Sequence, residues 1–172
     1  MASGVWCFGV RGVLWLQSGQ MKTAIIIVDH GSRLAESNQL TEQVVAKFGE
    51  RFADEFAIVE PAHMDITEPS IATAYKKCVD RGAQRIVICP YFLGPGKHWT
   101  RDIPRLATEA QKQHLQTTYH ITAILGLDDL MLELLHKRIT QCRVCDYCCN
   151  QCSQNQRCGP AARESSSTPA II

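Results

Sequence analysis

The chain has 172 residues, which corresponds to about one domain at a typical size of roughly 150 residues. It carries 18 basic and 17 acidic residues, so its net charge of +1 creates no overall field that would attract nucleic acid or an anionic membrane. No apolar run approaches the roughly 18 residues of a membrane-spanning helix, and a hydrophobic content of 45% argues against a disordered chain. The composition therefore predicts one soluble globular domain.

Residues 1–21 contain no acidic residue and one basic residue, Arg11. Two interpretations stay open: a leader or partial transit peptide of an organelle, which would be acid-poor, or a mis-assigned start with Met21 as the true first residue. Three glycines interrupt the apolar core that a secretory signal would need. We expect the folded domain to begin at residue 22.

Strand-like and helix-like patterns alternate from Lys22 onward. The segment TAIIIVDH (23–30) predicts a strand buried on both faces, and an amphipathic helix of about five turns follows it. A shorter strand is expected at 56–60, and a second helix accommodates Pro69 in its first turn and stops at Gly82. The apolar positions of the two helices are Leu40, Val44, Val45, Phe48 and Phe52, then Ile71, Ala74, Tyr75, Cys78 and Val79.

The second half of the domain repeats this alternation. RIVICPYFL (85–93) predicts a third strand, and the loop GPGKHW leads through Asp102 and Pro104 into a third helix. A fourth strand at 119–125 and a last helix at about 128–140 complete a domain of residues 22–141. Because alternating elements of these lengths require right-handed crossovers, the fold class is α/β, with a parallel sheet flanked by helices on both faces.

Polar residues gather where three of the expected strands end. The carboxyl ends of parallel strands open into one crevice, so these residues should meet there. Two imidazoles and a carboxylate are a ligand set that suits a first-row transition metal with open positions. The residues are Asp29, His30, Gly31 and Ser32; His63, Asp65 and Glu68; and Lys97, His98, Thr100, Arg101 and Asp102.

The individual residues also have structural interpretations. We assign His30 and His98 functional roles, and Asp65 has no evident structural one. For His63 the structural and functional interpretations stay open. Glu68 precedes Pro69 and is typical of an acid at a helix start. The remaining histidines, expected on ordinary helix or strand faces, are His114, His120 and His136.

Ser32 and Thr100 are predicted to cap helices, which would leave backbone N–H groups beside Arg33 and Arg101 for an anionic ligand. From the residues alone, a metal-handling enzyme and a phosphate-binding domain of similar topology both stay open. The absence of a G-x-G-x-x-G or Walker pattern after the first strand weakens the nucleotide interpretation.

Three ordered motifs resemble one family. VDHGSR, PAHMDITEPSI and PYFLGPGKHWTRDIP are similar to the short sirohydrochlorin chelatases of the CbiX type, especially their plant SirB form, over about residues 21–158. The resemblance implies a four-stranded sheet of order 2-1-3-4, a homodimer, no nucleotide cofactor, and insertion of Fe²⁺ into sirohydrochlorin to make sirohaem.

The resemblance also implies site residues. It places the metal-handling histidines at His30 and His98 and an assisting carboxylate at Asp65, where relatives have glutamate. These groups would bind Fe²⁺ and accept pyrrole protons, with Asp65 orienting an imidazole or relaying protons. Because the substrate carries eight carboxylates, its binding is assigned to Ser32, Arg33, Lys97, Thr100 and Arg101.

Six of the nine cysteines lie between positions 142 and 158, and the segment 159–172 after them is expected to be disordered. Disulfides are improbable under reducing conditions, whereas zinc and iron–sulfur ligation stay open on spacing alone. The resemblance implies an iron–sulfur cluster, [2Fe–2S] or alternatively [4Fe–4S]. The ligands that it implies are Cys142, Cys149, Cys152 and Cys158, with Cys145 and Cys148 as extra thiols.

Two alternatives to an iron chelatase stay open. One is a cobaltochelatase of a cobalamin pathway, because affinity order alone does not select Fe²⁺. The other is a non-enzymatic metallochaperone that uses the same histidines and cysteines to hand over iron. The plant resemblance further implies location in the chloroplast.

Overall fold

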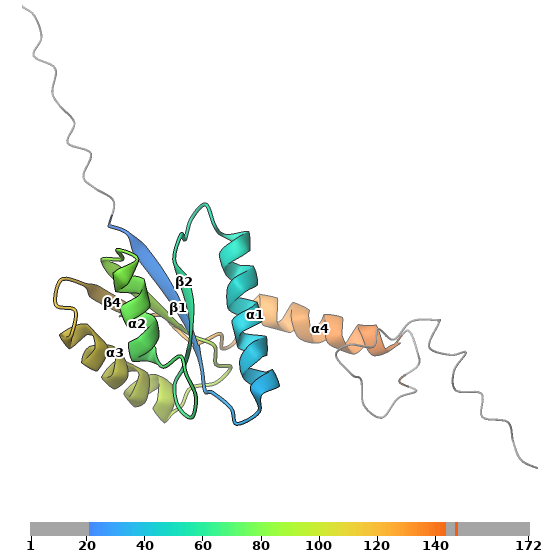
Figure 1. Ribbon diagram of the computed structural model, residues 1–172. Coiled ribbons are helices and arrows are strands. Elements are labelled where there is room, and N and C mark those ends of the chain that lie inside the picture. Colours follow the sequence, from blue (N-terminus) through green and yellow to red (C-terminus); the bar gives the residue numbers. More distant parts are fainter. Residues whose placement is uncertain (1–20, 144–146, 148–172) are drawn as a thin grey trace, which may run out of the picture.

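The computed structural model describes residues 21–143 and residue 147. The predicted leader, except Met21, and five of the six clustered cysteines lie outside the described residues, as does the tail at 159–172. The described residues form an α/β domain followed by one helix that extends away from it (Figure 1).

The sheet is parallel, and its order β2-β1-β3-β4 confirms the order that the resemblance implied. Its central strand β1 is the apolar run at the start of the domain, of which five consecutive residues are buried. A strand covered on both faces needs such an unbroken run, because each face must be apolar. The strands are β1 (Thr23–Asp29), β2 (Val59–His63), β3 (Arg85–Pro90) and β4 (Thr118–Ile121).

Helices cover both faces of the sheet, as predicted. Alternate residues of β1 point to opposite faces, so Ile25 and Ile27 pack with Val45 of α1, whereas Ile26 and Val28 face α2 and α3. The larger buried cluster lies under α2 and α3. The helical elements are α1 (Ala35–Arg51), α2 (Ile71–Asp80), the five-residue π-helix η1 (His98–Asp102), α3 (Ile103–Lys112) and α4 (Asp129–Arg143).

The boundaries of three predicted strands were wrong. β2 lies three residues later than the predicted 56–60, because its pairing with β1 fixes its register and Phe56 packs beside Phe48 instead. Pro61 fits inside β2, since an edge strand tolerates a missing N–H. β3 ends at Pro90, and β4 ends at Ile121 instead of Leu125.

Details of three helices also differ from prediction. Leu40 and Phe52 are exposed, so α1 buries a narrower stripe than its apolar spacing indicated. The N-cap of α1 is Leu34, two residues after Ser32, and its side chain caps nothing. Thr100 lies inside η1 and donates to the carbonyl of Gly96, so neither predicted cap forms. Pro69 precedes α2, whose N-cap is Ser70.

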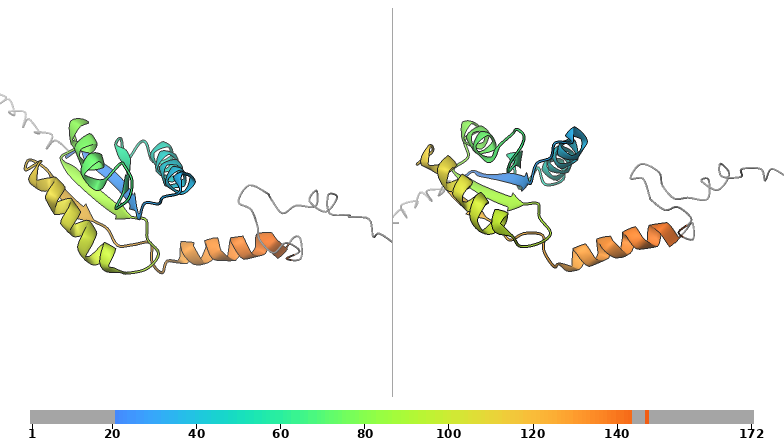
Figure 2. Two further views of the ribbon diagram at one scale, coloured as in Figure 1. Left: turned by 60° about the horizontal axis from the view of Figure 1, so that its bottom comes forward. Right: turned by 90° about the horizontal axis from the view of Figure 1, so that it is seen from below.

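The last helix, α4, projects from the domain in all views (Figures 1 and 2), and none of its residues is buried. Apolar side chains that normally pack inside a protein lie exposed along it, including Leu130, Leu134, Leu135 and Ile139. Within the described part of the chain, no helix is long and apolar enough to cross a membrane.

Candidate functional site

Loops that follow β1 and β3 bring His30 and His98 together. Their ring centroids are 4.4 Å apart, and the ring planes lie at 82° to each other. Both residues are exposed to solvent, and Phe92 packs beside His30 at 6.1 Å between centroids. The predicted meeting of two imidazoles at the carboxyl edge of the sheet is therefore confirmed, since parallel strands place both loops at the same edge.

His98 is oriented by a carboxylate one turn further along η1. Its Nδ1 lies 2.9 Å from Oδ2 of Asp102, whose side chain is largely covered, and Arg101 Nε donates to Oδ1 of the same residue at 2.9 Å. The hydrogen bond from Arg101, and then that from His98, lowers the pKa of Asp102. The Asp102 carboxylate holds Nδ1 of His98, so a metal ion would bind the other ring nitrogen, Nε2. A carboxylate on the second ring nitrogen is the usual arrangement behind a metal-binding histidine.

His30 is held through the turn that follows it. Gly31 has a φ of +79°, a region that glycine adopts without a steric penalty, and its N–H donates to Asp29 Oδ1 at 2.9 Å. Asn38 of α1 both accepts from the Ser32 N–H and donates to the Ser32 carbonyl, each at 2.9 Å. Asn38 was missed by the sequence analysis because no local pattern links it to this turn.

Asp65 lies against the backbone of His30. Its N–H donates to the His30 carbonyl at 3.3 Å, and its Oδ1 accepts from the Ile66 N–H at 2.8 Å. Thr67 N–H donates to the Asp65 carbonyl around Ile66, which has a φ of +71°, so this loop turns tightly. Among the described residues, no hydrogen bond joins the Asp65 carboxylate to either imidazole.

The predicted substrate-binding residues lie on the same loops. Arg33 and Lys97 are exposed, whereas Arg101 is paired with Asp102. The Ser32 hydroxyl oxygen accepts from the Leu34 N–H at 3.1 Å, so it stabilises the turn after His30.

Two residues with open or structural interpretations are now placed. His63 ends β2 with no exposed surface, and its Nδ1 lies 2.6 Å from Asp29 Oδ1. Glu68 Oε2 accepts from the Ser70 N–H at 2.7 Å, which lowers the pKa of Glu68. Its interpretation as a helix-start acid is confirmed.

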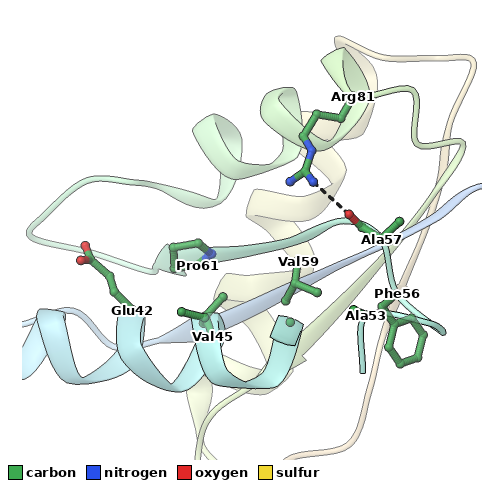
Figure 3. A pocket seen from close by; sticks show the side chains of 10 residues that line it. Glu42, Val45, Ala53, Phe56, Ala57, Val59, Pro61 and Arg81 are labelled. Atoms are coloured by element: carbon green, nitrogen blue, oxygen red, sulfur yellow. Dashed lines mark hydrogen bonds between the residues drawn. The ribbon is translucent and has the colours of Figure 1, made fainter. Parts of the chain in front are cut away.

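A pocket of about 360 Å³ lies elsewhere, between α1 and β2 (Figure 3). Arg81 at its rim donates to the Ala57 carbonyl at 2.9 Å and pairs with Glu60 at 2.7 Å. None of the loops that carry His30, Asp65 or His98 lines this pocket. Within the described residues, no group of three or more histidine, cysteine or acidic side chains forms a ready metal cage.

The sequence and the parallel α/β fold both match a known family of proteins. A sequence model of the CbiX family matches residues 24–142, and the chain belongs to this family. Over 136 residues, 79% of this chain, it is 46% identical to sirohydrochlorin ferrochelatase, chloroplastic, of Arabidopsis thaliana. Over 91 residues, 53% of this chain and 62% of the relative, it is 44% identical to sirohydrochlorin cobaltochelatase of Methanocaldococcus jannaschii.

The solved structures agree with this membership. The sirohydrochlorin chelatase SirB from Bacillus subtilis, solved in complex with cobalt, superposes with a TM-score of 0.60 at 27% identity, covering 70% of this chain. The chain spans about half of that structure and 60% of the Arabidopsis relative.

Proposed function

We propose that this chain is a metal chelatase that inserts Fe²⁺ into sirohydrochlorin and releases sirohaem. The observation that carries the proposal is the 4.4 Å separation of the His30 and His98 rings. Two imidazoles from separate loops offer nitrogen ligands to a first-row ion and leave its other positions open for pyrrole nitrogens. The name of the Arabidopsis relative supports iron and this substrate.

The reaction exchanges two pyrrole protons for one ion without a change of oxidation state. In the proposed mechanism His30 and His98 first hold Fe²⁺ beside the macrocycle. As the ion passes to the pyrrole nitrogens, each imidazole nitrogen that releases it accepts one of the two protons, because a neutral imidazole is both a ligand and a base. Asp102 fixes the orientation of His98 through the 2.9 Å hydrogen bond to Nδ1. Asp65, beside the His30 backbone, relays protons to solvent.

The surroundings of the two rings suit a flat, acidic macrocycle. Leu34, Ile66 and Leu93, on the same three loops, are 67%, 57% and 66% exposed and offer apolar contacts to its face. We assign its carboxylates to the cationic and hydroxyl groups of these loops. The assigned residues are Ser32, Arg33, Lys97, Thr100 and Arg101.

The test is metal insertion by the full chain under anaerobic conditions, followed by the absorbance of the tetrapyrrole. His30→Ala and His98→Ala should each lower kcat by roughly 100-fold, the usual effect of losing a positioned acid–base group. His120→Ala, on the exposed face of β4, is the matched control and should leave the rate unchanged. Wild-type rates in both active-site variants would refute the proposal.

Cobalt is the second candidate metal, because archaeal relatives are named cobaltochelatases and one solved SirB holds cobalt. Competition between Fe²⁺ and Co²⁺ at equal concentration decides between them, and preferential cobalt insertion would replace iron in the proposal. A metallochaperone would bind Fe²⁺ yet neither bind sirohydrochlorin nor accelerate its change in absorbance.

We also propose that the chain works as a homodimer, with a second copy covering α4. This helix exposes two pairs of apolar residues at i, i+4 spacing, which are Leu130 with Leu134 and Leu135 with Ile139. Two copies of a chain that spans half of a SirB chain would supply the missing half. Light scattering should give a dimer mass, and Leu130→Glu with Leu134→Glu should give monomers. A monomeric wild type would refute the proposal.

The cysteine segment, residues 142–158, is proposed to hold an iron–sulfur cluster, [2Fe–2S] or alternatively [4Fe–4S]. Cys142 on the last turn of α4 is half-buried, and thiolates are the donors that such clusters use. When bound, the cluster would supply one-electron redox chemistry. The proposed ligands are Cys142, Cys149, Cys152 and Cys158. Iron and sulfide analysis with electron paramagnetic resonance tests it, and bound zinc in place of iron would refute it.

Location in the chloroplast is proposed from the Arabidopsis relative, whose name includes it. The full chain fused at its C-terminus to a fluorescent protein should accumulate in plastids of leaf cells. Fluorescence confined to the cytosol would contradict this.

A further inference from the structure

A buried polar cluster lies behind the turn that carries His30, on the face of the sheet covered by α1. It consists of Asp29 at the end of β1, His63 at the end of β2 and Thr41 of α1. The exposed fractions are 0% for His63 and 5% for Thr41, and the Asp29 side chain is 15% exposed. A buried histidine outside the metal-handling pair calls for a physical explanation.

The carboxylate of Asp29 fixes the tautomer of His63. It accepts from the Gly31 N–H and from the Thr41 hydroxyl, and its Oδ1 lies 2.6 Å from His63 Nδ1. Because a carboxylate only accepts hydrogen bonds, Nδ1 of His63 carries the proton. Nε2 of His63 is buried and has no hydrogen-bond partner among the described residues.

The buried Nε2 of His63 destabilises the fold, because a buried nitrogen without a hydrogen-bond partner costs free energy. An apolar side chain at position 63 would avoid that cost. The Nδ1 contact with Asp29 is therefore the feature that accounts for histidine at this position.

The contact between His63 and Asp29 is connected to the proposed metal site through the Oδ1 atom of Asp29. Asp29 Oδ1 accepts from His63 Nδ1 and from the N–H of Gly31, the residue directly after His30. A Cβ added to Gly31 would lie 3.3 Å from the Cβ of His63, so the two residues are in close approach. We propose that His63 is a positioning residue: it holds the Asp29 carboxylate, which holds the Gly31 turn and thereby aims His30 at the ion.

This inference rests on the proposed function, and its first test uses two amide variants. Asparagine places its N–H close to the position of imidazole Nδ1, whereas glutamine places it closer to Nε2. His63→Gln and His63→Leu should lower kcat roughly tenfold or more, the usual effect of losing a partner behind a metal ligand, with KM for the tetrapyrrole changed less than twofold. His63→Asn should retain most of the wild-type kcat.

Tyr75→Phe is the matched control. It removes a buried hydrogen bond, from the Tyr75 hydroxyl to Thr117 at 2.8 Å, on the α2 side of the sheet. It should lower the unfolding free energy and leave kcat unchanged. If His63→Leu does not fold, the comparison of Asn with Gln still decides. Equal kcat in the Asn and Gln variants, or a wild-type kcat in Gln, would overturn the inference.

The second test uses Co²⁺ alone and needs no tetrapyrrole, so it separates failure of the inference from failure of the proposed function. Titration followed by the visible Co²⁺ spectrum should show roughly tenfold weaker binding in His63→Gln than in the wild type. In a His30→Ala background, His63→Gln should leave the affinity for Co²⁺ unchanged, because His63 acts on the ion only through His30. Equal weakening in both backgrounds would mean a purely structural role and would overturn the inference. If the wild type binds Co²⁺ but inserts no metal, the proposed function fails, and the Co²⁺ titration still decides the role of His63.

Discussion

Gly31→Ala tests whether the turn after His30 depends on glycine. Gly31 has a φ of +79°, and an added Cβ would overlap the backbone carbonyl oxygen of Asp65. That oxygen belongs to a tight turn around Ile66 and is not the movable end of a side chain. The overlap is therefore relieved only by moving the β2–α2 loop away from the turn that carries His30.

The magnitude follows from two terms. An alanine in the left-handed region costs about 1–2 kcal/mol, and forcing extra volume into a close-packed contact costs about 1–3 kcal/mol. The unfolding free energy of Gly31→Ala should therefore fall by about 2–5 kcal/mol. Gly49→Ala is the matched control, because Gly49 lies in α1 and its added Cβ would meet Val59 at an ordinary 3.7 Å. Glycine in a helix costs about 0.5–1 kcal/mol relative to alanine, so the control should stabilise.

The assay is urea unfolding followed by circular dichroism, together with metal insertion at a temperature where both variants are folded. Gly31→Ala should also lose activity, since the displaced turn carries His30. An unfolding free energy equal to that of the wild type, or full activity with the predicted destabilisation, would refute the reasoning that joins this turn to the site.

Three further predictions concern other side chains. Asp102→Asn should lower kcat about 10–100-fold, because the amide holds His98 Nδ1 less strongly, and steady-state insertion rates would show it; an unchanged rate would contradict the orienting role. The hydrogen bond from Ser70 N–H lowers the pKa of Glu68, so its contribution to stability is present above about pH 4.5 and disappears as the pH falls through the lowered folded-state pKa. Glu68→Gln should flatten the loss of unfolding free energy in that acid range, and identical pH profiles would count against it. Burial raises the pKa of Cys78 to about 12. Iodoacetamide at pH 8 should therefore leave Cys78 unmodified in the folded chain and alkylate it in urea, and peptide mapping measures this. Rapid modification of the folded chain would be inconsistent with this burial.

The sequence predicted the layers of the fold because hydrophobic periodicity reports burial directly. The unbroken apolar run of β1 identified a central strand, and five of its residues are indeed buried. Strand ends were less predictable. β2 begins at Val59 because pairing with β1 sets its register, and it accommodates Pro61 because β2 lies at the sheet edge.

The meeting of His30 and His98 was also predictable from the sequence, since parallel strands bring their carboxyl ends to one edge. The support for these two residues was not. Asp102 holds His98 only because η1 places it one turn away, and Asn38 reaches back across six residues to the turn at Ser32.

Local sequence by itself determined the order of strands and helices and the edge of the sheet at which the polar residues meet, because both follow from periodicity and chain direction. Only the tertiary structure decided that His63 is buried against Asp29 and that the Asp65 backbone requires glycine at position 31. Contacts of this kind join residues more than thirty positions apart. They depend on the packing of β1, β2 and α1 around one carboxylate, which no single segment of the chain encodes.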